Sequence, residues 1–401
     1  MKNEKQKSLI NKFSLTISVF FEGIAGYAYF AFLPTFLESK GFSDGAILFT
    51  MTWMGVGMAL FSWLLGRLSD KTGRRKLLFI FSIFGSIIVF LLLYLSDHIL
   101  YHCILNFMRG SLMGMLLPAS NALFAEIVEK ENRRKELTLN LETVEVSGVQ
   151  LSLLSAIRST GFAIGVLGSS FVISVYGINA LVIFLTIGTT ISLLFAIPVR
   201  DIKKDHLILE EGKIQEPVRK RAKVKSLLFI TVFFRQFGLI PFLQILSIII
   251  TDTGFSTSTA GLLIALNPIF QIIAMVINGR IIDNPKISEK IMLAIGFILS
   301  TLTLLCYAGG SATGNIFIFI LGQILLGYGW SCIYTGAVKY IINHAPMDRA
   351  FYMGIWVTDL QVARIISYQV FAFLWFVFSP TLVLPYAAIM PLIGFVLVFW
   401  L

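Results

Sequence analysis

The sequence predicts an all-α membrane protein in which twelve transmembrane helices form two pseudo-symmetric six-helix bundles. Three observations lead to this fold class. Of the 401 residues, 57% are hydrophobic and only 13% are charged, whereas a soluble globular chain is about a quarter charged. Apolar stretches near the ~20 residues that a membrane-spanning helix needs recur along the whole chain. Several motifs of the first half also recur in the second half at one constant spacing.

Twelve apolar stretches are expected to cross the membrane as helices. Hydrocarbon admits only helices and closed barrels, and these stretches are too long and continuous for barrel strands. We do not expect the first to be a secretory signal peptide, because it is too long and no small-residue cleavage site follows it. The expected spans are 13–37, 45–65, 77–96, 99–125, 148–175, 178–198, 226–251, 258–279, 288–308, 315–340, 350–378 and 381–401.

Basic residues are distributed unevenly between the connections. Of the 32 Lys and Arg residues, 27 lie in the N-terminal tail and in the connections that follow every second span, and the opposite connections hold only Lys40. This bias predicts a multi-pass protein of the plasma membrane with both termini in the cytoplasm. The bases lie in short loops that face anionic lipid headgroups. The net charge of +10 therefore does not indicate nucleic-acid binding.

Two polar connections are longer than the rest. The segment 199–225 divides the spans six and six, so we expect an N-terminal bundle at 1–198, a cytoplasmic linker, and a C-terminal bundle at 226–401. The segment 126–147 contains LTLNLETVEV, in which apolar and polar residues alternate. A period of two is typical of extended structure, and the segment is expected to hold a short hairpin or an extended insertion of unknown role.

Cysteine and histidine positions predict no cofactor and no metal. Cys103, Cys306 and Cys332 are scattered in or beside spans, without the spacing of a disulfide framework or a zinc site. His98 and His102 are four residues apart and could offer two ligands, but a polar helix start at the outer surface is the favoured interpretation. No nucleotide-binding loop, nucleophile–base pair or ligand cluster is found, so we expect no enzymatic activity.

The two halves of the chain are related by a shift of 213 residues. Both halves start on the same side of the membrane, which predicts parallel repeats about an axis along the membrane normal. Such an architecture has its binding site between the halves near the midplane. The shift brings Phe20-Phe21-Glu22 onto Phe233-Phe234-Arg235, Gly66-Arg67 and Asp70 onto Gly279-Arg280 and Asp283, and Gly114 onto Gly327.

The connection GRLSDKTGRRK at 66–76 carries the pattern G-x-x-x-D-x-x-G-R-R. This pattern resembles the signature between spans two and three of the major facilitator superfamily of transporters. A weaker copy, GRIIDNPKISEK, follows span eight, and RGSLMG, GFAIGVLG and PASNALFAEIVEKENRR are also similar to family features. The resemblance covers the whole chain. It implies the superfamily fold, a monomer, and alternating access driven by an ion gradient.

The resemblance also implies a cytoplasmic latch between the halves, engaged when the outer side is open. Gly66 would allow close helix approach and Gly73 a tight turn. Topology anchoring is the alternative for the arginines, although an anchor needs neither the acid Asp70 nor a glycine. The predicted latch residues are Gly66, Arg67, Asp70, Gly73, Arg74, Arg75, Gly279 and Asp283.

Ionisable residues within the spans indicate the working site, because charge at bilayer depth is costly and almost always faces a cavity or a partner. Glu22 lies ~10 residues into its span, roughly 15 Å along the helix. Its repeat equivalent is Arg235. Spans one and seven commonly face the central cavity in the superfamily, so the two side chains are expected to lie opposite one another. Glu22 is the candidate proton-coupling residue, and a permanent ion pair between the halves is the alternative.

The other intramembrane candidates leave similar alternatives open. Arg109, followed by Gly110 and Gly114, resembles the arginine motif that many proton-linked members carry on span four, or it makes a helix-packing salt bridge. Arg158, Arg364 and Asp359 contact substrate or brace helices. The uncharged candidates line the cavity or bridge helices, and they are Tyr27, Asn267, Gln271, Gln244, Trp330 and Tyr334.

The sequence therefore predicts a secondary active transporter of a small organic solute, coupled to protons and biased towards export. The glycines of span five resemble those of drug exporters, but the proline found there in exporters is absent. Four intramembrane arginines against two acids make uptake or exchange of an organic anion the alternative, because arginine binds carboxylate and phosphate groups bidentately. A non-transporting receptor or a lipid scramblase on the same scaffold is the alternative of another class.

Overall fold

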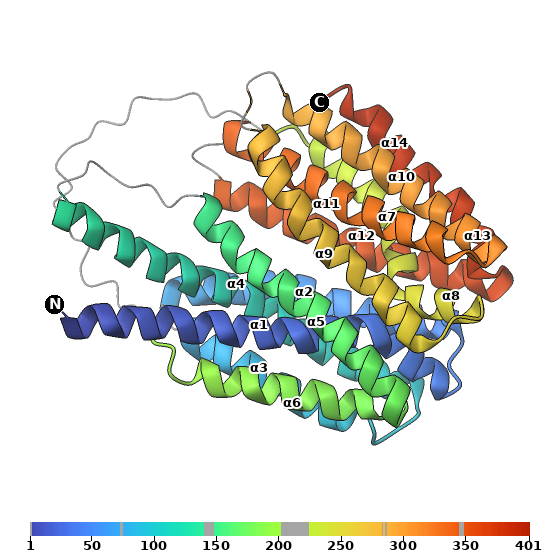
Figure 1. The fold of residues 1–401 in the computed structure, drawn as a ribbon, viewed down its shortest axis with the longest axis horizontal. Helices are drawn as coiled ribbons and strands as arrows, with labels where there is room; N and C mark the ends of the chain where they lie inside the picture. The colour runs from blue at the N-terminus through green and yellow to red at the C-terminus, as the bar shows by residue number, and fades with distance from the viewer. Residues whose placement is uncertain are drawn as a thin grey trace.

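The computed structural model describes residues 2–72, 75–139, 148–201, 224–282, 284, 287–344 and 349–401, and these contain no β-strand (Figure 1). The helices of the N-terminal half are α1 (Lys2–Ser39), α2 (Asp44–Thr72), α3 (Arg75–Leu92), α4 (Ile99–Leu139), α5 (Gly148–Tyr176) and α6 (Ala180–Ala196). Those of the C-terminal half are α7 (Leu227–Gln244), α8 (Leu246–Asp252), α9 (Thr257–Ile282), α10 (Glu289–Thr313), α11 (Ile316–His344), α12 (Arg349–Val377), α13 (Pro380–Ala387) and α14 (Ile389–Val398).

The helices match the twelve expected spans. Eleven stretches are long and apolar enough to cross a membrane, and α6 is a shorter apolar helix. Two spans are interrupted. The α7–α8 span breaks at Ile245, whose N–H reaches the oxygen of Pro241 at 3.4 Å. The α13–α14 span breaks at Ala388, between Pro385 and Pro391. The prediction of an all-α membrane protein is confirmed.

Several helices continue beyond the apolar spans. α1 begins at Lys2, and α4 runs on to Leu139 through a charged segment. Glu, Lys, Arg and Ala are good helix formers that need no apolar surroundings. The prediction of a connection that begins at residue 126 is therefore wrong for 126–139, which is helical. The rest of the expected hairpin, 140–147, and the linker residues 202–223 lie outside the described residues.

The repeat is visible in the backbone. Gly41, in the turn before α2, and Gly254, in the turn before α9, are 213 residues apart and have φ values of 86° and 95°. Gly114 on α4 and Gly327 on α11 each abut the backbone of the equivalent helix. A Cβ on Gly114 would lie 2.8 Å from the Met58 oxygen on α2, and a Cβ on Gly327 would lie 2.7 Å from the Asn267 oxygen on α9. The two six-helix bundles are thus pseudo-symmetric.

The two halves share one hydrophobic core only at one end of the molecule. We call this the distal end; it holds the turns at Gly41 and Gly254, and the helices of both halves converge on it near α8 and α13 (Figure 1). The shared core contains residues of both halves, among them Phe32 and Phe242. Towards the end where α1 begins, each half has a core of its own, one around Phe124 and one around Phe297.

Hydrogen bonds between the halves follow the same division. Thr35 donates to Ser247 at 3.0 Å, and Ser247 donates to the Ala31 oxygen at 2.9 Å. Gln244 donates to the Phe30 oxygen at 3.0 Å. Gln369 on α12 donates to Thr52 on α2 at 2.8 Å. Within the described part of the chain, every hydrogen bond between the halves belongs to this distal set, so the structure is closed at its distal end.

Candidate functional site

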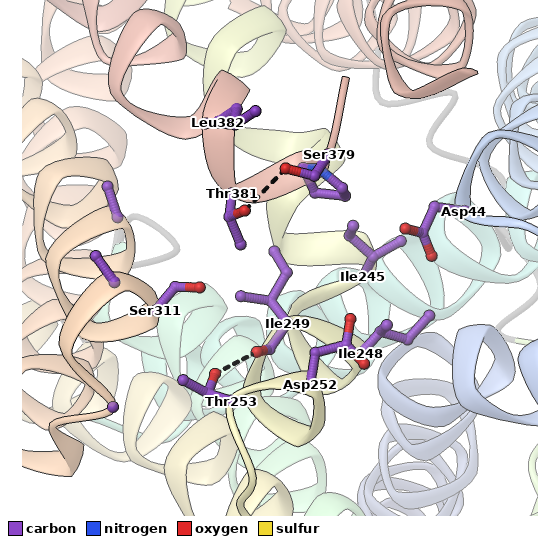
Figure 2. A pocket seen from close by; sticks show the side chains of 14 residues that line it. Asp44, Ile245, Ile248, Ile249, Asp252, Thr253, Ser311, Ser379, Thr381 and Leu382 are labelled. Carbon is purple, nitrogen blue, oxygen red and sulfur yellow. Dashed lines mark hydrogen bonds between the residues drawn. The ribbon is translucent and has the colours of Figure 1, made fainter. Parts of the chain in front are cut away.

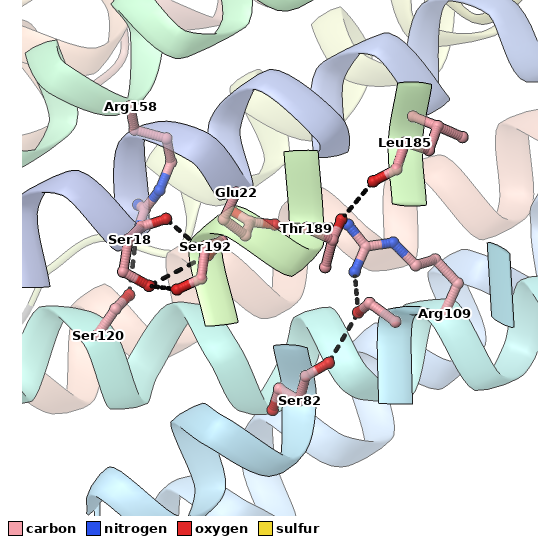
Figure 3. Close-up of polar contacts among 10 residues, drawn as sticks. Ser18, Glu22, Ser82, Arg109, Ser120, Arg158, Leu185, Thr189 and Ser192 are labelled. Carbon is pink, nitrogen blue, oxygen red and sulfur yellow. Dashed lines mark hydrogen bonds and ion pairs between the residues drawn. The ribbon is translucent and has the colours of Figure 1, made fainter. Parts of the chain in front are cut away.

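The buried ion pair of Glu22 and Arg109 is the centre of the candidate site. Arg109 Nη2 lies 3.4 Å from Glu22 Oε1, and the two side chains are 1% and 4% exposed. Arg109 Nη1 also donates to Ser86 Oγ on α3 at 2.6 Å (Figure 3). The pair therefore joins α1, α3 and α4 inside the N-terminal half. Two charges removed from water are stable only when paired and hydrogen-bonded, as they are here.

Close helix packing makes room for this pair. A Cβ on Gly26, one turn after Glu22, would lie 3.1 Å from Glu22 Oε1 and 3.4 Å from Arg109 Nη2. The Arg109 guanidinium also lies over the Phe90 ring, 5.1 Å from its centroid. A cation over an aromatic face is attracted by the ring. The guanidinium is thus fixed by a carboxylate, a hydroxyl and an aromatic ring.

Arg158 on α5 is the second cation near Glu22. Its Nη2 donates to Ser120 Oγ on α4 at 2.9 Å (Figure 3). It interacts electrostatically with Glu22 and with Tyr334 on α11 of the other half. One carboxylate therefore faces two arginines, and the group of three carries a net positive charge. The hydrogen bond to Ser120 fits the bracing alternative for Arg158.

Arg235 occupies a different environment from the one expected. Its Nε donates to Ser300 Oγ at 2.9 Å, and its Nη1 donates to Gln236 Oε1 at 3.2 Å. The guanidinium lies 5.0 Å from the centroid of the Trp330 ring. No ion pair joins Glu22 to Arg235 in the described structure. An ion pair of Glu22 and Arg235 between the halves was the alternative to proton coupling; in this structure Glu22 is paired with Arg109 instead, because α1 and α4 pack within one half.

The two charged candidates on α12 have few polar partners in the described structure. Arg364 lies over the Phe30 ring of α1, 5.9 Å from its centroid, and so reaches the other half. Asp359 Oδ2 is buried and has no hydrogen-bond partner in the described residues. The five-residue spacing of Asp359 and Arg364 gives no ion pair between them among the described side chains, since residues three or four apart face each other on a helix.

The uncharged candidates divide into aromatic and amide groups. Tyr27 stacks on Phe162 with ring centroids 4.7 Å apart, and Trp330 lies 6.3 Å from Tyr334. Gln244 donates to the Phe30 oxygen and accepts from Tyr368, so it bridges helices. For Asn267 and Gln271 the contact that the structure gives is the close approach of their backbone to Gly327.

The structure describes only part of the predicted latch. The backbone of Gly66, Arg67 and Asp70 belongs to α2. The side chains of these positions, together with Gly73, Arg74 and Asp283, lie outside the described residues. A Cβ on Gly279 would meet nothing within 4 Å.

Arg75 is the described member of the predicted latch, and it forms an ion pair within one half. Its Nη1 lies 2.7 Å from Glu126 Oε1 on α4. The neighbouring Lys76 N–H donates to Asp201 at 2.7 Å and so joins the start of α3 to the first part of the linker. Sequence reasoning had assigned no role to Glu126, Asp201, Ser86 or Ser300. The near-equivalent spacing of the two serines in the repeats was the available signal.

A cavity of about 660 Å³ lies at the distal end and was not predicted from the sequence (Figure 2). It is lined by Asp44 of α2 and by residues of α8, α10 and α13. None of the predicted cavity residues lines it. Asp252 lies at its edge, and burial raises the pKa of this carboxyl above its ordinary value. The cavity therefore brings carboxylates of both halves together at the closed end.

Comparison with known proteins identifies relatives over most of the chain. A family model described as Major Facilitator Superfamily matches residues 15–250 and 226–401. "Multidrug resistance protein 2" of Bacillus subtilis is 23% identical over 336 residues, which cover 80% of this chain and 78% of that protein. "Multi-drug resistance efflux pump PmrA" of Streptococcus pneumoniae is 23% identical over 327 residues, covering 79% of this chain and 76% of that protein.

Solved structures with the same fold also exist. A substituted variant of the nucleoside transporter NupG superposes with a TM-score of 0.77 at 13% identity, covering 97% of this chain and 99% of that one. A POT family transporter in complex with 5-aminolevulinic acid superposes with a TM-score of 0.73 at 13% identity, covering 97% and 95%. At this identity the likeness describes the fold alone.

Proposed function

The chain belongs to the Major Facilitator Superfamily of transporters, and from this premise we propose that it exports a small organic solute in exchange for protons by alternating access. The observation that carries the proposal is the Glu22–Arg109 ion pair. An arginine does not give up its proton, so the carboxylate is the titratable member. Protonation of Glu22 cancels its attraction to Arg109 and loosens α1 from α4. A proton is thereby coupled to the helix that joins the halves at the distal end.

The proposal includes an orientation and a conformational state. Of the 32 basic residues, 27 lie in the N-terminal tail and in the connections on the same side of the membrane. This supports a plasma-membrane protein with cytoplasmic termini. In that orientation the closed distal end faces outwards, and this conformation is inward-facing. Residues 1–198 and 226–401 are the two units that rock about the site between them. The latch residues 66–75 engage in the opposite, outward-facing state.

Export is the direction that the relatives support. Both carry names that describe multidrug resistance or efflux, at 23% identity. The packing of Gly161 and Gly165 of α5 onto α1 is consistent with the exporter-like motif of span five: a Cβ on either would lie 2.4 or 2.2 Å from a backbone oxygen of α1. This packing is needed whichever way transport runs.

The test uses purified protein in liposomes that enclose a pH-sensitive dye, with ethidium as the lipophilic cation and benzoate as the organic anion. We expect one of these probes to move protons across the membrane when it is added. Glu22→Gln is expected to abolish accumulation driven by a proton gradient and to keep part of the probe exchange at equal concentrations. Glu22→Asp keeps a titratable group and is expected to retain partial coupling.

Glu289→Gln is the matched control, because Glu289, at the start of α10, accepts a hydrogen bond from Asn343 of α11, away from the ion pair. Accumulation by the Glu22→Gln protein at the wild-type level would show that Glu22 is not the coupling residue. Silence of the folded wild-type protein with every probe would overturn proton-coupled transport and leave the receptor and scramblase alternatives.

Uptake or exchange of an organic anion is the second candidate. The observation in its favour is the excess of buried cations, since Arg109, Arg158 and Arg235 outnumber the carboxylate Glu22. A proton signal with benzoate and none with ethidium would favour this candidate over cation export.

A further inference from the structure

The C-terminal half holds the Arg235 guanidinium among the three helices that are equivalent to those around Arg109 in the N-terminal half. Arg109 is fixed between α1, α3 and α4 by Glu22 and Ser86. The repeat equivalents of these helices are α7, α10 and α11, and Arg235 is fixed among them by Ser300 and Trp330. The two serines are 214 residues apart, within one residue of the repeat shift.

The two guanidinium groups differ in the helix that carries them and in their counter-ion. At the repeat position of Glu22 stands Arg235 itself, and at the repeat position of Arg109 stands Gly322. The C-terminal half therefore has no carboxylate at the position equivalent to Glu22. Arg235 is 2% exposed, and its partners Ser300, Gln236 and Trp330 are all neutral. A buried charge without a counter-ion is unfavourable, so this copy lacks one anion.

The hydrogen bonds of Arg235 leave Nη2 of the guanidinium available. Nε and Nη1 donate to Ser300 and Gln236. Nη2 makes no hydrogen bond with the part of the chain that the structure describes. The Nη1–Nη2 edge is the fork that binds a carboxylate or phosphate group through two parallel hydrogen bonds. The geometry therefore leaves Nη2 without a partner among the described residues, on an edge where Nη1 already donates to Gln236.

Gln323 supplies an independent sign of a ligand. It lies on α11 seven residues before Trp330, and residues two turns apart share a face of a helix. Its side chain is 1% exposed, and neither Oε1 nor Nε2 has a hydrogen-bond partner in the described structure. Buried amides are almost always hydrogen-bonded. Tyr307, seven residues after Ser300 on α10, likewise has a buried hydroxyl without a partner.

These groups share one direction from Arg235. On α10 the step from Ser300 to Tyr307 runs towards the distal end, and on α11 the step from Trp330 to Gln323 does the same. Tyr334, on the same face of α11, interacts electrostatically with Arg158 of the other half, so this face is turned towards the space between the halves. The cationic group, the Trp330 ring and the unpartnered polar groups therefore follow one another towards the distal end.

We propose that Arg235, Ser300 and Trp330 form an anion subsite of the C-terminal half, which takes the carboxylate or phosphate group of the transported organic solute, with Gln323 as its next polar contact. The inference rests on the proposed transport function, since the solute enters between the halves. Proton coupling remains with Glu22 in the N-terminal half. The N-terminal half thus couples transport to protons, and the C-terminal half binds the anionic group of the solute.

The test measures equilibrium binding to the full chain in detergent at neutral pH, by calorimetry, with four probes that share one ring. These are benzoate, phenyl phosphate, benzyl alcohol and benzylamine. We expect benzoate or phenyl phosphate to bind at least tenfold more tightly than the neutral alcohol and the cationic amine. Inorganic phosphate as a competitor distinguishes the two sources: displacement of the ligand would indicate a phosphate site, and its failure together with benzoate binding a carboxylate site.

Arg235→Gln is expected to weaken anion binding at least tenfold, and Arg235→Lys to weaken it less, because lysine keeps the charge and loses the fork. Arg200→Gln, which changes a surface arginine beyond α6, is the matched control and is expected to bind as the wild type does. Equal binding of all four ring probes by the wild type would overturn the subsite, even if Arg235→Gln does not fold. So would unchanged anion binding by a folded Arg235→Gln protein.

Failure of this subsite is distinguishable from failure of the proposed function, because the binding assay needs neither a membrane nor a proton gradient. Loss of coupling in Glu22→Gln with no anion preference in the wild type would keep the transport proposal and remove the subsite. Anion binding that depends on Arg235, without any proton movement in liposomes, would keep the subsite and remove proton coupling.

Discussion

The hydroxyl of Thr35 on α1 donates a hydrogen bond to Ser247 on α8 at 3.0 Å and so joins the two halves at the distal end. Ser247 in turn donates to the Ala31 oxygen one turn earlier on α1 at 2.9 Å. The interruption of the seventh span at Ile245 turns the start of α8 against α1. The helix that carries Glu22, the proposed coupling residue, therefore also carries hydrogen bonds that close the distal end.

Removal of the Ser247 hydroxyl should weaken this closure. Ser247→Ala loses two hydrogen bonds between the halves, each worth about 0.5–1.5 kcal/mol net. We expect the ratio of distal-closed to distal-open molecules to fall by about 2- to 10-fold for the loss of one such bond, and by more for both. Double electron–electron resonance between spin labels at Ser43 and Ser256, which are exposed in distal turns of the two halves, would measure the ratio.

Thr251→Ala is the control for this substitution, because the Thr251 hydroxyl bonds only within its own helix, to the Ser247 and Ile248 oxygens. Its distance distribution should match that of the unsubstituted protein. An unchanged distribution for Ser247→Ala would mean that apolar packing and the remaining hydrogen bonds of Gln244 and Gln369 hold the distal end closed without Ser247.

Closure of the distal end should also depend on pH through Asp252. Burial raises the pKa of this carboxyl above its ordinary value of 3.8, and the carboxylates of Glu38 and Asp44 interact with it. The closed state thus binds the Asp252 proton more tightly than a solvated aspartate does. Its contribution to closure is fully present below the ordinary pKa and is lost as the pH rises through the raised pKa.

Asp252→Asn should therefore remain closed as the pH rises, whereas the wild type opens progressively; the Ser43–Ser256 distance measures both. Asp97→Asn is the control. The hydrogen bond from Lys40 lowers the pKa of Asp97, so its contribution is lost as the pH falls, and both partners lie in the N-terminal half. A wild-type distance that does not change with pH would contradict the role of Asp252.

Hydropathy and the repeat shift predicted the helices and their order, because a span is recognised by apolar length alone. The ends of the helices were predicted less accurately. α1 begins at Lys2 and α4 continues to Leu139, since a helix continues into water wherever its residues are good helix formers. The break at Ile245 was missed for the opposite reason. Pro241, Gln244 and Ser247 lie close to it, but the stretch 226–251 as a whole is apolar and so predicts one unbroken span.

The sequence predicted which charged residues belong to the site, but not which of them form an ion pair. Glu22, Arg109, Arg158 and Arg235 were all recognised because ionisable residues are rare within spans. The repeat shift identifies equivalent helices but does not reveal which side chains of neighbouring helices meet. Glu22 therefore pairs with Arg109 of its own half. Small hydroxyl residues such as Ser86 and Ser300 give no signal in a single sequence unless the two repeats are aligned.

Disruption of the buried ion pair should destabilise the N-terminal half unequally. Glu22→Gln leaves both Arg109 and Arg158 without the carboxylate that interacts with them, whereas Arg109→Gln leaves Glu22 with Arg158. Removing one partner of a buried pair costs about 3–5 kcal/mol. We expect Glu22→Gln to lower the thermal midpoint in detergent more than Arg109→Gln does, and the double variant to recover part of the loss.

Thermal unfolding of the three variants, followed by circular dichroism, would measure this order. Equal midpoints for the wild type and Glu22→Gln would indicate that the pair contributes no net stability. A double variant less stable than either single variant would show that the two side chains act independently.

Glycines at the α2–α4 contact should tolerate no side chain. A Cβ on Gly110 would lie 2.0 Å from the backbone oxygen of Met54, and neither backbone can yield without separating the helices. Forcing extra atoms into a packed contact costs about 1–3 kcal/mol, so Gly110→Ala should lower the thermal midpoint. Gly354→Ala is the matched control, because a Cβ there would meet nothing within 4 Å, and it should stabilise α12 by about 0.5–1 kcal/mol. A Gly110→Ala protein as stable as Gly354→Ala would mean that α2 and α4 do not pack this closely in the membrane.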